Sequence, residues 1–345
     1  MKTFYVTDLT NGLSLSGEAF AIAEVMRMAD KYERPYLKLV LADKTGKVDA
    51  KIWNDALAKS DQKIFKEGSV ILIDGSVEDY RGKIQVTVTS AKRADESKLD
   101  DFIEKSQFDA TEMMSELMSY VEKIEHKALR SIVQEMFKDE AFKTSYKFWP
   151  AAKSVHHDFR SGLLQHVLEM LNIAYSMKKF YPMANYDILT AGIILHDMGK
   201  FEEFSINGIS TEYSKKGILV GHIPLGALTF DKYAKGKLSE DLYYHMLHMI
   251  LAHHGEQQYG SPIVPATIEA VMLSYIDRLS DKARCAVQAV EDISPGEEFG
   301  KYNPWMENAR FWKGGNYDDI SEELEETLDK QNEEGDQLIF SSENE

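Results

Sequence analysis

Residues 191–200 read AGIILHDMGK, and this stretch decides the fold of the C-terminal two thirds of the chain. An apolar, helix-forming run leads directly into an imidazole and a carboxylate, His196 and Asp197. Polar groups are costly in apolar surroundings unless they are paired or bind an ion. Since the two side chains are adjacent, both can reach one metal ion. The stretch therefore predicts a metal centre carried by buried helices.

Five further side chains of the same kind lie in apolar, mostly helical stretches on either side of this pair. One buried histidine is more often a hydrogen-bonded core residue than a ligand, but convergence from separate helices reverses that expectation. Nitrogen and oxygen ligands without thiolates suit Mn, Fe, Co, Mg or Zn. Seven ligands exceed what one ion usually takes from protein, so we expect two adjacent ions. The predicted metal ligands are His166, His196, Asp197, His222, His253, His254 and Asp277.

The length and composition of the chain indicate the kind of protein that carries this predicted metal centre. A chain of 345 residues with 43% hydrophobic content suggests two domains with packed cores. The single cysteine, Cys285, excludes a disulfide framework and fits a reducing compartment. The first residues, MKTFYVTDLTNG, lack the apolar core of a signal peptide, and no apolar run approaches the length of a membrane span. We expect a cytoplasmic protein with no membrane partner.

The net charge of −17 is unevenly distributed. Residues 318–345 hold twelve acidic residues and one lysine, which makes this tail −11. Residues 15–93 hold fourteen basic and twelve acidic residues, a balance of +2. The N-terminal module is therefore not repelled by phosphate, and the tail is expected to be a solvated end.

The first ninety-odd residues predict five β-strands. Several of the segments alternate apolar and polar residues, DKTGK at 43–47 predicts a hairpin turn, and 55–65 has helical composition. Five strands with a helix between the third and fourth is the order of an OB-fold, a small barrel often used on single-stranded nucleic acid. The expected strands are 19–29, 35–43, 47–53, 69–77 and 83–91.

The rest of the chain predicts an acidic linker followed by an all-α domain. We place an OB-fold domain at 1–94, the linker at 95–111, the helical domain at 112–317 and the acidic tail at 318–345. Apolar spacings of three and four predict the helices, and they place His166 on the core side of its helix and His253 and His254 beside Met246 and Ile250 on theirs. The expected helices are 111–125, 127–138, 163–179, 187–198, 239–254 and 266–290.

The order H…HD…H…HH…D on helices resembles the HD-domain metal-dependent phosphohydrolases, and HDMGK matches their HDxGK form. The strand KVDAKIWND, at 47–55, resembles the OB modules of tRNA-anticodon binders. An OB module followed by an HD domain with HHDFRSGLLQH, at 156–166, resembles the YhaM-type 3′-5′ exoribonucleases of Gram-positive bacteria. This resemblance covers roughly residues 15–310.

The resemblance implies a metal-dependent 3′-5′ exoribonuclease that takes single-stranded RNA to nucleoside 5′-monophosphates, with single-stranded DNA as a second substrate. It implies one divalent ion held by His166, His196, Asp197 and Asp277, and a second held by His222, His253 and His254. Asp197 would bridge the two ions, for which we expect Mn²⁺, and would orient the attacking water.

Other residues are weaker candidates. Lys200 could neutralise a phosphate oxygen or be a solvated lysine at a helix end. Arg278 could contact substrate or pair with an acid such as Asp281. Substrate contacts are also expected, against the alternatives of loop hydrogen bonding and strand packing, for a set comprising His156, His157, Arg160, Tyr36, Trp53 and Tyr80.

Two other functions are compatible with the residues. One is a phosphohydrolase for small linear or cyclic nucleotides with a regulatory OB module. The other is a non-catalytic nucleic-acid-binding protein with a structural metal. The sequence leaves the native metal and the oligomeric state open, although both modules could supply interfaces between copies.

Overall fold

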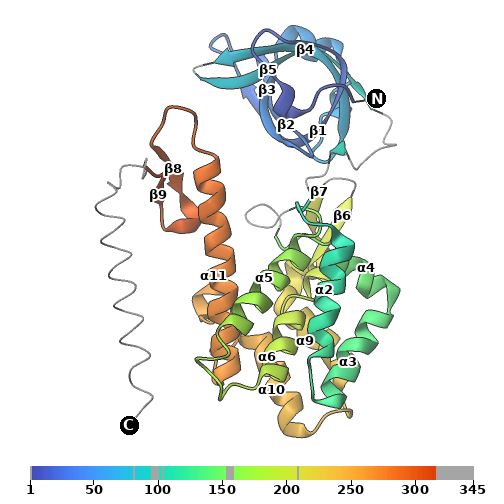
Figure 1. The fold of residues 1–345 in the computed structure, drawn as a ribbon. Coiled ribbons are helices and arrows are strands. Elements are labelled where there is room, and N and C mark those ends of the chain that lie inside the picture. Colours follow the sequence, from blue (N-terminus) through green and yellow to red (C-terminus); the bar gives the residue numbers. More distant parts are fainter. Residues whose placement is uncertain are drawn as a thin grey trace, which may run out of the picture. The chain divides into compact units, whose positions relative to one another are not determined.

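A computed structural model describes residues 2–80, 82–94, 101–102, 105–152, 159–207 and 210–315 (Figure 1). The chain divides into two compact units, Met1–Val287 and Gln288–Glu345. The acidic tail expected at 318–345 and part of the expected linker lie outside the described residues. Within the described part of the chain, no helix is both long enough and apolar enough to span a bilayer.

The N-terminal strands form a closed barrel in the order β1-β2-β3-β5-β4 (Figure 1). All neighbouring pairs are antiparallel except β3 and β5, which are parallel. This confirms the OB-fold expected from the sequence. The strands are β1 (Ser14–Ala29), β2 (Pro35–Asp43), β3 (Gly46–Ile52), β4 (Val70–Tyr80) and β5 (Lys83–Arg93).

The barrel interior follows from alternation along the strands. In β2, Leu37, Leu39 and Leu41 are buried, while the residues between them face outward. The strand β1 starts earlier than the predicted residue 19. The pairing of β1 with β4 shifts register between Leu15 and Glu18, so the strand continues through a bulge that alternation does not predict.

The helix predicted at 55–65 is interrupted. Helix α1 (Asn54–Lys59) ends at Ser60, whose backbone is extended, and a separate 3-10 turn follows at Gln62–Ile64. Asp61 causes the break because its side chain accepts a hydrogen bond from the Lys63 amide and starts the new turn.

The C-terminal part of the chain is mainly helical, as expected, and holds one large apolar core. Helix α6 is buried along almost its whole length, and the Tyr146 hydroxyl donates to the Ile194 carbonyl at 2.7 Å inside it. The helices are α2 (Ala110–Glu122), α3 (Lys127–Lys138), α4 (Glu140–Phe148), α5 (Gly162–Ser176), α6 (Tyr186–Leu195), α7 (Lys200–Glu203), α8 (Lys215–Val220), α9 (His222–Ala234), α10 (Glu240–Ala252) and α11 (Ile268–Glu291).

The domain differs from the prediction in three places. A hairpin, β6 (Phe204–Asn207) and β7 (Ser210–Tyr213), interrupts the expected all-α pattern. Helices α4, α7, α8 and α9 lie outside the predicted helices. In α9, Pro224 is in the first turn, where proline is tolerated because the amide has no partner. Helix α10 ends at Ala252, two residues before the predicted end at 254, and His253 is its C-cap residue with helical backbone angles.

The second unit contains the end of α11 and a short antiparallel hairpin. Its strands are β8 (Phe299–Asn303) and β9 (Ala309–Trp312). The side chain of Asn303 accepts from the Trp305 amide and caps the turn between them.

Candidate functional site

The seven predicted ligands come from five segments of the helical domain. His166 lies on α5, while His196 and Asp197 follow directly after α6. His222 is the first residue of α9, and Asp277 lies in the middle of α11. The remaining two, His253 and His254, follow α10.

The first group of ligands lies around Asp277. The Nε2 atom of His166 is 3.1 Å from Asp277 Oδ1, and His196 Nε2 is 3.9 Å from the same oxygen. His196 Nε2 is also 3.3 Å from Asp197 Oδ2. His166, His196 and Asp197 each offer one ligand atom, all within 4.8 Å of one another. Since nitrogen and oxygen ligands bind an ion at about 2 Å, such separations suit one shared ion.

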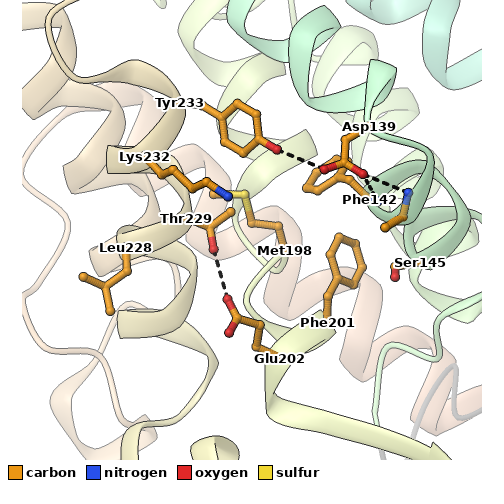
Figure 2. A pocket seen from close by; sticks show the side chains of 11 residues that line it. Asp139, Phe142, Ser145, Met198, Phe201, Glu202, Leu228, Thr229, Lys232 and Tyr233 are labelled. Atoms are coloured by element: carbon orange, nitrogen blue, oxygen red, sulfur yellow. Dashed lines mark hydrogen bonds between the residues drawn. The ribbon is translucent and has the colours of Figure 1, made fainter.

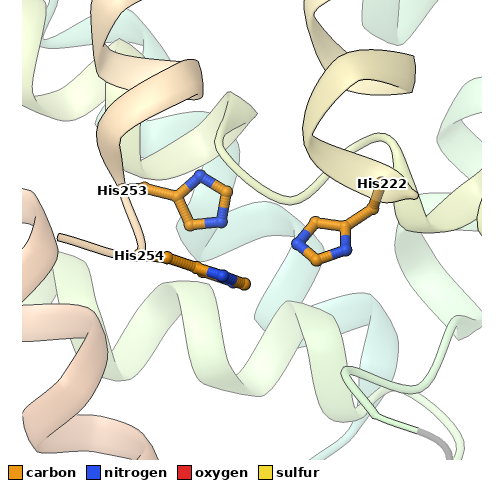
Figure 3. A group of neighbouring side chains, drawn as sticks. All are labelled: His222, His253 and His254. Carbon is orange, nitrogen blue, oxygen red and sulfur yellow. The ribbon is translucent and has the colours of Figure 1, made fainter. Parts of the chain in front are cut away.

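The second group is the trio of imidazoles His222, His253 and His254, which point toward one another from the start of α9 and the end of α10 (Figure 3). Asp197 connects it to the first group. Its Oδ1 is 3.5 Å from His222 Nε2 and 3.6 Å from His253 Nε2. One carboxylate therefore faces both groups, one oxygen toward each.

The imidazole rings are oriented through their other nitrogen. His196 Nδ1 lies 2.8 Å from the Ile193 carbonyl, and His253 Nδ1 lies 2.7 Å from the Ile250 carbonyl. A carbonyl only accepts, so each Nδ1 carries the proton and each Nε2 is a lone-pair donor when the ring is neutral. His254 repeats this arrangement with a carbonyl at 2.8 Å.

Unsatisfied buried atoms test whether these residues fit a metal. The buried atoms His196 Nε2, Asp197 Oδ1, His222 Nε2 and His253 Nε2 have no hydrogen bond of acceptable geometry within the described part of the chain. Such orphaned groups are rare and need an explanation. Divalent cations beside Asp197 supply one, because each of these atoms can offer a lone pair and the three imidazole nitrogens lie 3.3–3.6 Å from the Asp197 carboxylate. The donor set therefore fits a divalent metal centre.

The electrostatics point the same way. Burial lowers the pKa of His253 to about 4, which keeps it neutral and able to ligate. Burial opposes charge on His196 too, but Asp197 and Asp277 outweigh it and raise its pKa to about 9. The pKa of Asp197 lies well below its ordinary value despite burial, because Lys200 and His196 are beside it.

The lysine and the glycine of the HDMGK motif are both constrained by close contacts at the site. Lys200 Nζ is 2.6 Å from Asp197 Oδ2, and the lysine side chain is only 13% exposed, so it is not the solvated helix-end lysine of the alternative interpretation. A Cβ on Gly199 would lie 1.9 Å from the His222 carbonyl oxygen and 2.6 Å from the Gly226 amide nitrogen. Only glycine lets α9 bring His222 this close to Asp197.

Four residues around the ligands were missed from sequence. Asp281 groups with His166 and Asp277 as a possible ligand, and its position one turn after Asp277 was the available signal. Glu203 Oε1 lies 3.0 Å from His222 Nδ1 and accepts from the His222 amide, also at 3.0 Å. Its adjacency to a ligand arises only from the fold.

Ser280 and Glu169 complete the surroundings of His166. Ser280 Oγ is 3.0 Å from His166 Nδ1 and donates to Glu169 Oε2 at 3.1 Å. Arg284 in turn pairs with Glu169. The serine hydroxyl thus accepts from the ring and leaves His166 Nε2 directed at Asp277.

The remaining sequence candidates of this domain lie apart or outside the described residues. His156 and His157 fall outside them. Arg160 precedes α5 with its guanidinium 4.3 Å from the Phe148 ring. Arg278 pairs with Glu256 at 3.2 Å, where Asp281 had been the suggested partner.

The barrel aromatics form one exposed cluster. The rings of Tyr36 and Trp53 lie 4.8 Å apart, and Trp53 and Tyr80 are 42% and 56% exposed. Lys51 Nζ lies 5.8 Å from the Trp53 ring and 5.3 Å from the Tyr80 ring. These aromatics are therefore not barrel core, and a cation lies among them.

Comparisons with known proteins cover both domains. Residues 21–94 match the family of OB-fold nucleic acid binding domains, and residues 163–281 match the HD domain family. The chain is 35% identical over 285 residues to the 3′-5′ exoribonuclease YhaM of Geobacillus sp. (strain WCH70), covering 81% of this chain and 86% of the relative. The proteins of the same name from Bacillus subtilis (strain 168) and Oceanobacillus iheyensis are each 33% identical, over 81% and 88% of this chain and 88% and 98% of their own.

Proposed function

Because this chain belongs to the YhaM family of 3′-5′ exoribonucleases, we propose that it removes nucleotides one at a time from the 3′ end of single-stranded RNA. Water would attack the last phosphodiester, the bond from phosphorus to the preceding 3′ oxygen would break, and that oxygen would take up a proton. The products would be a nucleoside 5′-monophosphate and a strand with a new 3′-hydroxyl. The observation that best supports this proposal is the cluster of buried ligand atoms without hydrogen bonds around Asp197.

The residues suggest two ions. His166, His196, Asp197 and Asp277 would hold the first, and Asp197 would share the second with the imidazole trio. Two divalent ions supply Lewis-acid activation of water and a clamp on the attacking and leaving oxygens. We propose Mn²⁺, with Fe, Co, Mg and Zn as the alternatives that the same donor set allows.

Two side chains would act directly on the reacting groups. Asp197 stays ionised because its pKa is low, so its carboxylate can accept a hydrogen bond from the attacking water and orient it. Lys200 keeps its charge because the neighbouring carboxylate raises its pKa against the effect of burial. Its ammonium would neutralise charge on a phosphate oxygen.

The exposed barrel cluster of Tyr36, Trp53 and Tyr80 supports a role in holding the strand. Bases stack on aromatic side chains for about 1–3 kcal/mol each, and Lys51 would meet the backbone phosphate. Stacking does not read the 2′-hydroxyl, so single-stranded DNA is a second proposed substrate. We place the activity in the cytoplasm, where the single cysteine would stay reduced.

A labelled-oligonucleotide assay tests the proposal. The full chain and Mn²⁺ are incubated with single-stranded RNA labelled at the 5′ end or, separately, at the 3′ end. We expect a ladder from the 5′-labelled strand and early release of labelled mononucleotide from the 3′-labelled one, with both lost in Asp197→Asn. An intact strand beside rapid hydrolysis of a small nucleotide substrate would refute the exonuclease and favour a small-molecule phosphohydrolase.

A further inference from the structure

A second pocket of the helical domain lies at the start of α5, away from the ligand residues. It has a volume of about 570 Å³ and is lined by residues 105–111, 147–148 and 160–161. The lining residues that carry its chemistry are Lys105, Phe108, Lys147, Phe148, Arg160 and Ser161.

The walls of this pocket are held by hydrogen bonds. The Ser106 amide donates to the Arg160 carbonyl at 3.1 Å, and Lys105 and Arg160 form a parallel bridge. The Ser106 hydroxyl donates to Gln165 Oε1 at 2.8 Å. The segment before α2 is therefore attached to α5, and the pocket between them is a built feature of the domain.

The lining combines positive charge with aromatic surface. Three cations, Lys105, Lys147 and Arg160, face one acid, Asp109, so the lining carries a net charge of +2 in a chain of net −17. Asp109 is already engaged, because its carboxylate accepts from two amides at the start of α2. Phe108 is 53% exposed. Phosphate and a base with an open face are the two groups that such a lining recognises.

The pocket is connected to the metal centre through α5. Ser161 caps this helix and His166 lies five residues further, about 7.5 Å along the axis at 1.5 Å per residue. Gln165, which holds Ser106, immediately precedes that ligand. The pocket and a predicted metal ligand are therefore carried by the first two turns of one helix.

Another pocket of the domain has the opposite character (Figure 2). It has a volume of about 370 Å³, and Asp139 and Glu202 outnumber its one cation, Lys232. Tyr233 hydrogen-bonds to Asp139 at 3.4 Å there, over an apolar floor that includes Phe201. Phosphate would be repelled by this lining, which leaves the pocket at α5 as the better nucleotide site.

We propose that the pocket at the start of α5 binds a nucleotide of the substrate strand close to its 3′ end. The inference rests on the proposed exonuclease function and adds a strand-holding subsite to it. Lys147 and Arg160 contact the phosphate, and the exposed Phe108 contacts the base. The subsite favours polynucleotides over small phosphodiesters, because a small substrate reaches the metals without filling it.

Crosslinking tests the site itself. Full-length protein, kept metal-free with a chelator so that nothing is cleaved, is irradiated with RNA carrying one 4-thiouridine at successive positions from the 3′ end. We expect crosslinks to residues among 105–111, 147–148 or 160–161 for one or two positions near that end. Crosslinks confined to the barrel and to other parts of the helical domain at every position overturn the proposal.

Kinetics separate the pocket from the metal centre. Lys147→Glu should raise the KM for an RNA oligonucleotide by about tenfold or more, as expected for a lost charged contact. Lys143→Glu is the matched control, because Lys143 lies one turn earlier on α4 and pairs with Glu140 at 3.7 Å outside the pocket. Phe108→Ala, an exposed change that does not threaten folding, should also raise the KM.

Hydrolysis of bis(p-nitrophenyl) phosphate reports on the metals alone and should be unchanged in all three variants. If wild type hydrolyses this substrate but not RNA, the exonuclease function fails, and crosslinking still decides the pocket. Equal KM values for Lys147→Glu, Phe108→Ala and the control overturn the subsite while leaving the exonuclease intact.

Discussion

Glu203 offers a sharp test of the metal centre, because it touches a ligand without being one. Its Oε1 lies 3.0 Å from His222 Nδ1, in a position where the glutamate is only 7% exposed. The carboxylate makes the ring more electron-rich and fixes its orientation toward Asp197. We therefore examine the replacements Glu203→Gln and Glu203→Ala.

The structure gives the size of the effect. A hydrogen bond to a charged group contributes about 1.5–3 kcal/mol and a neutral one about 0.5–1.5, so removing the charge costs the His222 ligand about 1 kcal/mol. Since about 1.4 kcal/mol is tenfold in affinity, Glu203→Gln should weaken metal binding by roughly fivefold. Glu203→Ala leaves the ring nitrogen of His222 without a hydrogen-bond acceptor. This replacement should weaken metal binding by up to about a hundredfold.

Titration calorimetry with Mn²⁺ on the full-length, metal-stripped protein measures this directly. Glu202→Gln is the control, because the adjacent Glu202 pairs with Lys216 and does not contact a ligand. The loss should appear in the weaker of two binding events if two ions bind. Unchanged affinity in Glu203→Ala, with the fold intact by circular dichroism, would show that His222 does not ligate a metal.

Three further predictions concern the same centre. Gly199→Ala should lower the melting temperature by several degrees, because the added Cβ would lie 1.9 Å from a backbone oxygen. Overpacking of this kind costs about 1–3 kcal/mol. A melting curve equal to that of wild type would contradict the close approach. Metal binding at pH 7 should release a proton, because the pKa of His196 is raised to about 9 and its Nε2 must lose a proton to bind a metal. Calorimetry in buffers of different ionisation enthalpy measures the number of protons released. A value of zero would contradict the assignment of His196 as a ligand. Removing metal with a chelator should abolish hydrolysis, and Mn²⁺ should restore it in wild type but not in Asp197→Asn, where restored activity would exclude the shared carboxylate.

The sequence alone predicted an N-terminal barrel followed by a helical region, together with most of their elements. Strand alternation predicted the barrel, because a small closed sheet has one dry face and one wet face along every strand. Helical periodicity predicted α2, α3, α5, α6, α10 and α11, because each long amphipathic helix records its buried face in its own residues. The seven ligand residues stood out for the same local reason, since charge and imidazole are rare in apolar helices.

Contacts between residues that are distant in the sequence became apparent only in the tertiary structure. No local pattern brings Glu203 to His222 or Ser280 to His166, since both contacts arise from packing of separate helices. Helix α9 lay outside the predicted helices, although a proline such as Pro224 is compatible with a first helical turn. The same is true of the position of Asp197 between two groups of imidazoles and of the pocket beside α5, which form only when the helices pack together. Periodicity in the sequence specifies which face of a helix is buried but not which helix it packs against.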